Sequence, residues 1–281
     1  MILNGSDAVW LDKHQVKAHA PLLDISDSAR FPVKGGLLQA RAGTARHDAV
    51  AWGYARGADA RGVDIIQNCE VTGIDIENGG VVGVQTSRGA IKAKKIGTAV
   101  AGNTGHIAAM AGMRLPIESH VLQAMVSEPL KPCLDTVVTS GATHCYISQS
   151  DKGELVMGGD LDFYNSYAQR GNFPRIEDVV ASIISMFPAF SRLRLMRTWG
   201  GIMDMSMDGS PIITKTDIHG FYINGGWCYG GFKATPGSGW VYAHTIANDT
   251  PHKLNEGFAL NRFERGYMID ESGSGSTPNA H

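Results

Sequence analysis

A glycine-rich segment near the C-terminal end constrains the fold more than any other part of the sequence. The stretch GGWCYGGFKATPGSG holds seven glycines or prolines between Gly225 and Gly239, after a short apolar strand and before a helical pattern. Glycine permits tight turns and lets a backbone approach a ligand closely. A helix that begins after such a turn presents unpaired N–H groups and a partial positive charge, which can hold a phosphate or the edge of a flavin. The same stretch could also simply join a strand to a helix.

Two residues within this stretch sharpen the prediction. Lys233 could place an ammonium group against a bound carboxylate or a flavin, although a solvated surface charge is the simpler role. Pro236 suits the first turn of a helix, because the N–H that proline lacks would be unpaired there. The apolar spacing that follows predicts a helix over residues 238–248.

A second candidate site lies at a predicted loop-to-helix junction, in the sequence GTARHD. His47 could act as a nucleophilic imidazole, with Arg46 beside it to pair an anion such as phosphate. Alternatively, Asp48 or Thr44 only caps the helix.

Two further histidines are weaker candidates. His144 and Tyr146 flank Cys145, so the alternation of a strand would place both on one side and let them line a pocket. His120 lies at the start of another predicted strand. For each histidine, a hydrogen-bonded position in the core is the commoner role.

The remaining hydrophobic patterns predict a mixed chain of helices and short strands. Helices are expected over residues 7–20, 107–113 and 176–190, the last starting near Pro174. Strands separated by turns are expected over residues 63–66, 71–76, 81–86, 90–93 and 96–101. A β-meander, and a strand that leads into a glycine-rich turn, are recurring parts of large flavoproteins.

Composition excludes several classes of protein. The net charge is −2, from 25 basic and 27 acidic residues, so no single-sign field is available for nucleic acid or an anionic membrane surface. The four cysteines are far apart and form no CxxC pair, which argues against a metal site and for free thiols in a cytoplasmic protein. No stretch approaches the roughly 20 apolar residues that span a bilayer.

The stretch GGWCYGGFKATPGSGWVYAHTIA resembles the C-terminal flavin-binding segment of the D-amino-acid oxidase-like superfamily. Three further stretches resemble the β subunits of heterotetrameric sarcosine oxidase: FPVKGGLLQARAGTARHDAVAWGYARGADARGVDIIQNCEV, HVLQAMVSEPLKP and SQSDKGELVMGGDLD. The similarity runs in order from about Trp10 to about Asp270, and therefore covers nearly the whole chain.

The resemblance implies an α/β fold with an α+β substrate domain, in which a glutathione-reductase-like FAD-binding fold is interleaved with a sheet-based domain. Residues 43–113 and 206–268 would form the FAD-binding part. Residues 1–42 and 114–205 would form the substrate domain, and residues 269–281 a disordered tail. The implied reaction is oxidative demethylation of sarcosine to glycine, with formaldehyde passing to tetrahydrofolate. The implied partners are sarcosine or a related N-methyl amino acid and the α, γ and δ subunits of a heterotetramer.

The resemblance also implies two flavins and roles for particular residues. FMN would be attached covalently through His47, beside Arg46. Non-covalent FAD would contact Val71 and the C-terminal loop, whose matching residues are Cys228, Gly230, Gly231, Lys233 and Gly237. Lys233 would also hold the substrate carboxylate, and His144 falls near the pocket histidine of the family.

The sequence departs from the family pattern in two ways. Cys228 stands where glycine is expected, and its side chain is expected to crowd a flavin contact. A dinucleotide-binding unit with G-x-G-x-x-G should come first, and none is found, so we expect a truncated chain that holds only part of the FAD site. Two alternatives therefore stay open: a single-flavin dehydrogenase or oxidase for another N-methyl or D-amino acid, and a non-catalytic fragment.

Overall fold

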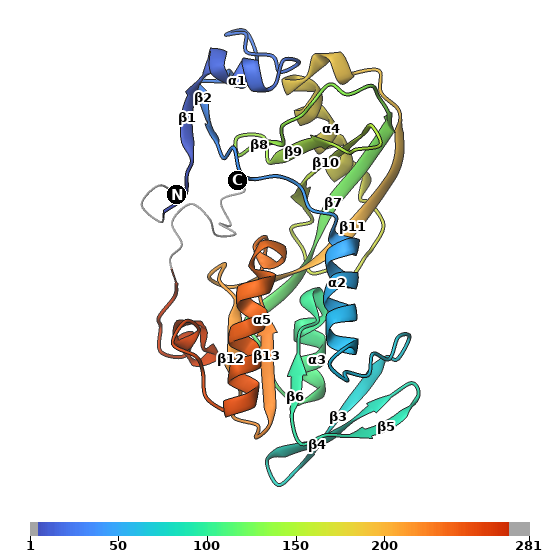
Figure 1. The fold of residues 1–281 in the computed structure, drawn as a ribbon, viewed down its shortest axis with the longest axis vertical. Helices are drawn as coiled ribbons and strands as arrows, with labels where there is room; N and C mark the ends of the chain where they lie inside the picture. Colours follow the sequence, from blue (N-terminus) through green and yellow to red (C-terminus); the bar gives the residue numbers. More distant parts are fainter. Residues whose placement is uncertain (1–4, 270–281) are drawn as a thin grey trace. The chain divides into compact units, whose positions relative to one another are not determined.

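A computed structural model describes residues 5–269 and shows a mixed α/β chain (Figure 1). The strands are β1 (Val9–Asp12), β2 (Gly35–Leu38), β3 (Val71–Glu77), β4 (Gly80–Thr86), β5 (Gly89–Lys92), β6 (Ile96–Thr98), β7 (Ile117–Pro129), β8 (Val138–Ser140), β9 (Cys145–Gln149), β10 (Glu154–Leu161), β11 (Leu195–Ser206), β12 (Ile212–Lys215) and β13 (Phe221–Gly225). The helices are α1 (Lys13–His19), α2 (His47–Asp59), α3 (Thr104–Met110), α4 (Phe173–Met186) and α5 (Gly231–Asn248). Short 3₁₀ turns are η2 (Ala101–Asn103), η3 (Pro188–Phe190), η4 (Glu256–Phe258) and η5 (Leu260–Arg262).

The chain forms two compact units, each made of several segments. Unit 1 comprises residues 1–65, 122–161 and 169–201, and unit 2 comprises residues 66–121, 162–168 and 202–281. The predicted division into a FAD-binding part and a substrate part stays a prediction, because compactness alone does not show which segments hold a cofactor. The predicted tail lies almost wholly outside the described residues.

Unit 1 is built on a sheet covered by helix α4. In the strand order β11-β7-β10-β9-β8, strands β7 to β10 pair antiparallel. Helix α4 packs against β9 and β10 (Figure 1). Its buried residues Ile176, Val179, Ile183 and Met186 recur at helical spacing and form one apolar face. This face joins Met125, Ile147, Leu155 and Phe187 in the core of the unit.

Unit 2 contains a three-stranded sheet in the order β12-β13-β6, in which β13 runs antiparallel to β12 and parallel to β6. Helix α5 packs on β12 and β13, and the meander β3-β4-β5 forms a separate sheet (Figure 1). The core of the unit is made of apolar side chains from the meander, from α3 and from β12 and β13: Val81, Ala108, Ala111, Leu115, Ile212, Phe221 and Ile223.

Several predicted elements are confirmed and three are wrong, wholly or in part. The meander, the amphipathic helix at α4 and the mixed α/β class are confirmed. Residues 63–66 form no strand in the described part of the chain, because they pair with no neighbouring strand and leave Val63, Ile65 and Ile66 half-exposed. Apolar side chains alone do not make a strand without a partner for the backbone.

The predicted helix over residues 7–20 is wrong in its first half. Residues 9–12 form β1 and pair with β2, and α1 starts only after Asp12. The Asp12 carboxylate accepts from the N–H of Gln15 at 2.9 Å, while the Gln15 side chain accepts from the N–H of Asp12. This capping box stops the helix from extending towards the N-terminus.

The predicted start of the last helix is also wrong. Helix α5 begins at Gly231 rather than near residue 238, so Pro236 lies inside the helix and not in its first turn. Proline has no N–H, so the carbonyl of Phe232 loses its usual partner four residues on. Contacts of the preceding loop, described below, start the helix earlier than residue propensities indicate.

Phe187 is the position where we predict the largest loss of stability in unit 1. It is fully buried and its ring stacks on Phe190 with 5.4 Å between the centroids. Phe187→Ala should lower the free energy of unfolding by about 3–5 kcal/mol, because truncation leaves a cavity. Urea unfolding would measure this, with Phe173→Ala, at a residue 78% exposed, as the control. Equal effects of the two substitutions would contradict the prediction.

Candidate functional site

Two turns of unit 2 meet at the carboxyl ends of parallel strands. Strand β6 leads through η2 into α3, and β13 leads through a glycine-rich loop into α5. A Cβ added to Gly225 would lie 2.6 Å from Cγ2 of Thr104, so the two turns are in direct contact. The crevice beyond the carboxyl ends of parallel strands is where ligands bind in open α/β sheets.

The loop after β13 is bonded to Asp204 of β11 at three successive residues. The Asp204 carboxylate accepts from the N–H of Gly226 at 2.5 Å and from the N–H of Trp227 at 3.3 Å. Its backbone carbonyl accepts from the N–H of Cys228 at 3.1 Å. Thr104 at the start of α3 places its hydroxyl 3.3 Å from the same carboxylate.

The start of α5 carries positive charge and no acidic residue. Gly230 is the N-cap residue, no side chain caps the helix, and the first turn contains no acidic side chain. Lys233 lies exposed in that turn and forms no ion pair in the described part of the chain. The ammonium group of a lysine and the positive end of the helix dipole have the same sign and repel each other, so the arrangement favours a bound anion that both can attract. A Cβ at Gly237 or Gly239 would meet open space, so those positions are accessible.

Cys228 adopts a backbone conformation that favours glycine, with φ at 50°. This agrees with the expectation of glycine at this position. Its sulfur lies 3.7 Å from the Ser206 hydroxyl and 3.6 Å from the carbonyl of Gly226. The side chain is therefore turned towards β11.

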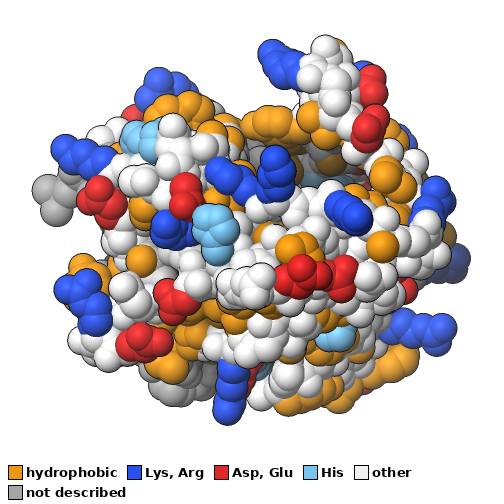
Figure 2. Space-filling view, turned by 90° about the horizontal axis from the view of Figure 1, so that it is seen from below, with side chains coloured by type: hydrophobic (Ala, Val, Ile, Leu, Met, Phe, Trp, Pro, Cys, Tyr) orange, Lys and Arg blue, Asp and Glu red, His pale blue; other side chains and the backbone are white. Residues whose placement is uncertain are grey.

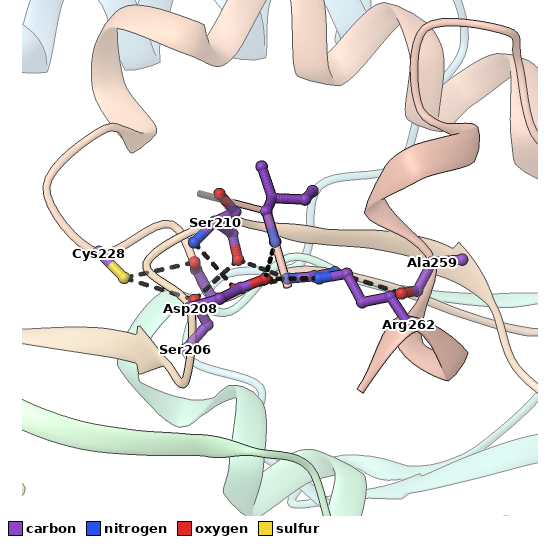
Figure 3. A network of polar contacts seen from close by, with 8 residues as sticks. Ser206, Asp208, Ser210, Cys228, Ala259 and Arg262 are labelled. Carbon is purple, nitrogen blue, oxygen red and sulfur yellow. Dashed lines mark hydrogen bonds and ion pairs between the residues drawn. The ribbon is translucent and has the colours of Figure 1, made fainter. Parts of the chain in front are cut away.

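A second buried carboxylate forms an ion pair beside this loop (Figure 3). Arg262 donates to Asp208 through Nε and Nη2, both at 2.9 Å, and the two side chains are 3% and 2% exposed. Arg262 also donates to the carbonyl of Ser210, which accepts from the Ser206 hydroxyl as well. This network ties the segment after α5 to the β11–β12 turn.

The two carboxylates differ in the direction of their pKa shifts. Burial raises the pKa of Asp204, and the backbone N–H donors only partly oppose that effect. Burial also disfavours the charged form of Asp208, but the hydrogen bonds from Arg262 and from two backbone N–H groups hold its pKa below the ordinary value. The Arg262 guanidinium beside Asp208 therefore accounts for the opposite directions of the two pKa shifts.

Arg46 and His47 lie at the start of α2 in unit 1, and both are exposed. Arg46 is the N-cap residue and makes a loose ion pair with Asp48 at 3.8 Å, without capping the helix. Helix α2 contains no buried residue, and Trp52 and Tyr54 are 55% and 53% exposed. The predicted caps by Thr44 or Asp48 are therefore wrong.

The structure distributes the other predicted site residues between the two units. His144 is exposed in a turn of unit 1 with φ at 48°, so the prediction that it alternates within a strand is wrong; β9 begins one residue later. Lys233 belongs to unit 2, as does Val71 at the start of β3. His120 bonds the carbonyl of Asp162 and the Glu118 carboxylate, which confirms the structural interpretation.

Unit 1 also contains a cavity of about 580 Å³. Its lining is mostly apolar and comes from α1, from residues 30–38 and from residues 136–143. None of the predicted site residues lines it. The candidate site is therefore assigned to the glycine-rich turns of unit 2, where the polar groups converge.

The surface adds little to the choice of ligand. On the face shown in Figure 2, Lys and Arg side chains are scattered among Asp and Glu side chains rather than gathered in one patch. Within residues 5–269, no helix is long and apolar enough to cross a membrane.

The sequence matches the FAD dependent oxidoreductase family, DAO, over residues 2–245. The chain belongs to this family of flavin-dependent oxidoreductases. It is 63% identical over 281 residues to the sarcosine oxidase subunit beta of Rhizobium meliloti (strain 1021), covering 67% of that protein. It is 54% identical over 271 residues to the protein of the same name from Arthrobacter sp, again covering 67% of it. The chain thus spans about two thirds of the length of these relatives.

A solved structure supports the fold. The crystal structure of L-proline dehydrogenase from P. horikoshii has a TM-score of 0.86, with 26% identity, and the match covers 94% of this chain and 71% of that one. The predicted fold class and the predicted resemblance to sarcosine oxidase β subunits are both confirmed.

Sequence reasoning missed Asp204, Asp208 and Arg262. Asp204 stands between two methionines in an apolar strand, and such an acidic residue indicates a buried polar role. Its partners, Gly226 and Thr104, could not be found in the sequence, because they are far from it along the chain.

The Asp208–Arg262 pair generates a stability prediction. Asp208→Asn should lower the free energy of unfolding by about 3–5 kcal/mol, because a buried guanidinium loses its countercharge. Asp27→Asn is the control, since Asp27 is 74% exposed and pairs with Lys13 at the surface. That substitution should change the free energy of unfolding far less, because solvent screens an ion pair at the surface. Urea unfolding at neutral pH would compare the two, and equal losses would contradict the buried pair.

The same pair should produce acid sensitivity. Because the pKa of Asp208 is lowered in the folded state, its contribution is complete above the ordinary aspartate pKa of about 3.9 and is lost as pH falls through the folded value. The Asp208→Asn variant should therefore lose less stability between pH 5 and pH 2 than the unchanged chain, by about the contribution of one carboxylate. Thermal unfolding across this pH range measures the difference.

Proposed function

We propose that this chain acts as the β-type subunit of a complex that uses FAD to oxidise sarcosine to glycine. The observation that carries the proposal is the glycine-rich start of α5, where an uncapped helix end and Lys233 stand together without an acidic residue. The 63% identity to a protein named sarcosine oxidase subunit beta supports the choice of substrate.

The residues at the two turns fit a flavin. The N–H groups of the first turn of α5 are unpaired in the helix, and they can stabilise negative charge on the ring of a bound flavin. Gly230, Gly231 and Gly237 let the ring approach the backbone, and Val71 and Cys228 complete the set that we assign to FAD. When bound, FAD accepts a hydride from the amine; the protein contributes position and charge.

Lys233 would hold the substrate carboxylate. It is exposed at the start of α5. Its ammonium group and the positive end of the helix dipole would both attract the substrate carboxylate. The role of His144 as a pocket residue rests on the family resemblance alone, and this side chain is exposed in unit 1.

His47 would carry a covalent FMN, with Arg46 pairing the phosphate. Both side chains are exposed at the start of α2, and the bidentate geometry of a guanidinium suits a phosphate group. We assign the remaining subunits α, γ and δ to the same complex, with formaldehyde passing to tetrahydrofolate. Trp52 and Tyr54, further along α2, are exposed and suit contact with another chain.

A single-flavin dehydrogenase is the second candidate. The 26% identity to an L-proline dehydrogenase over nearly the whole chain favours it. The presence or absence of flavin on His47 separates the two functions.

Lys233→Met should raise KM for sarcosine by about 10- to 100-fold, because one charge-assisted hydrogen bond to the carboxylate is lost. The change in kcat should be smaller, since binding of the non-reacting group is removed. Steady-state kinetics of the purified complex would measure both constants. Lys253→Met, at another exposed lysine of unit 2, is the matched control. An unchanged KM in the Lys233 variant would contradict the assignment of Lys233 to the substrate carboxylate.

Tryptic peptides of the purified complex should contain an FMN adduct on His47, detected by mass spectrometry. His47→Gln should abolish the adduct while leaving bound FAD unchanged. His14→Gln, at an exposed histidine of α1, should leave both flavins in place. An unmodified His47 in a complex that still holds FAD would favour the single-flavin dehydrogenase. A purified complex that contains neither FMN nor FAD would contradict both functions.

A further inference from the structure

Asp204 is a buried carboxylate to which the proposed reaction gives no role. It is 3% exposed and makes no ion pair in the part of the chain that the structure describes. The groups that contact its carboxylate are neutral: its own N–H, the N–H groups of Gly226 and Trp227, and the hydroxyl of Thr104. Burying a carboxylate without a cation is costly unless hydrogen bonds compensate, so this position requires a specific explanation.

Residues from both turns of the site contact this carboxylate. Gly226 and Trp227 belong to the loop after β13, and Thr104 begins α3 after β6. The single hydroxyl proton of Thr104 faces two acceptors, the carbonyl of Ala101 at 2.6 Å and the Asp204 carboxylate at 3.3 Å, so this hydroxyl stands between η2 and the carboxylate. A side chain that bridges two loops from separate strands fixes their separation.

Two backbone hydrogen bonds continue from Asp204 to the start of α5. The backbone carbonyl of Asp204 accepts from Cys228, and the carbonyl of Trp227 accepts from the N-cap residue Gly230 at 2.8 Å. Every residue from Gly226 to Cys228 is thus bonded to Asp204, and the next turn leads directly into the helix. A displacement of the carboxylate would therefore be transmitted to the first turn of α5.

The chemistry of the position suits aspartate in particular. Each carboxylate oxygen accepts from one backbone N–H, and Oδ2 also faces Thr104. Asparagine has the same size, but one of its two terminal atoms is a donor. In either orientation of the asparagine amide, its NH2 group would face the N–H of Gly226 or the N–H of Trp227, and that hydrogen bond would be lost.

We propose that Asp204 is a positioning residue that clamps the two glycine-rich turns together and so fixes the first turn of α5 against FAD. The inference rests on the proposed function, because it assumes that these turns hold the flavin. It assigns Asp204 no contact with substrate or cofactor; the residue acts through the N–H groups of the loop.

The test compares variants of the purified complex by FAD dissociation constant and by FAD reduction potential. Asp204→Asn should raise the dissociation constant at least about tenfold, as expected for one lost hydrogen bond to a charged acceptor. It should also lower the potential, because the helix start no longer stabilises the reduced, anionic flavin. A merely structural role would lower the melting temperature without moving the potential, and that result would overturn the inference.

A second variant covers the case in which Asp204→Asn does not fold. Thr104→Val keeps the shape of the side chain and removes only the hydroxyl link, so it should raise the dissociation constant about threefold and shift the potential in the same direction. Thr245→Val is the matched control: Thr245 is also buried and lies in the later part of α5, where its hydroxyl donates to the carbonyl of Val241 and accepts from the side chain of Asn255. Both constants should stay unchanged in the control.

The outcomes separate the inference from the proposed function. If the complex without any substitution binds no FAD, the proposed function is overturned, and the inference with it. A complex that holds FAD and oxidises sarcosine, but whose Asp204 and Thr104 variants keep the same affinity and potential, would overturn the inference alone.

Discussion

The parallel pairing of β6 with β13 is the interaction on which the candidate site depends. Thr98 pairs with Ile223 in this ladder, and its hydroxyl bonds the carbonyl of Tyr222, 124 positions further along the chain. Parallel strands cannot be joined by a tight turn, so the long intervening chain is necessary to bring the two carboxyl ends together. A Cβ at Gly97 would lie 2.8 Å from Ile246, which shows how closely α5 covers the strand.

Asp204 and Asp208 stand four residues apart, and their surroundings give the two buried carboxylates different chemistry. Arg262 neutralises Asp208, lowers its pKa and makes the pair a cross-link between chain segments. Asp204 meets only neutral donors, so burial dominates and raises its pKa. Buried charge is normally paired or strongly hydrogen-bonded. The unpaired carboxylate is therefore the more informative one, because its position is explained by the backbone groups that it holds.

Local patterns in the sequence predicted the elements that depend on local interactions. The meander and α4 follow from alternation, turn residues and helical spacing, and the glycine-rich stretch marked the loop that the structure places before α5. The start of α5 could not be predicted, because it depends on bonds from Gly226 and Trp227 to Asp204. The turn at His144 could not be predicted either, since it relies on Gly159, where an added Cβ would collide with the carbonyl of His144. The capping box, in contrast, is visible in the sequence, because Asp12 is followed three residues later by Gln15.

Cys228 shows how a departure from a family pattern is accommodated. A left-handed conformation costs a residue with a side chain roughly 1–2 kcal/mol relative to glycine. The expected crowding depends on where that side chain points. Its sulfur lies against the Ser206 hydroxyl (Figure 3), and it also lies 3.6 Å from the carbonyl of Gly226. The side chain therefore fills space between the loop and β11, and the backbone of the loop keeps the conformation that glycine would adopt. The substitution costs conformational energy within the loop, while the bonds from Asp204 to its neighbours keep the loop in place.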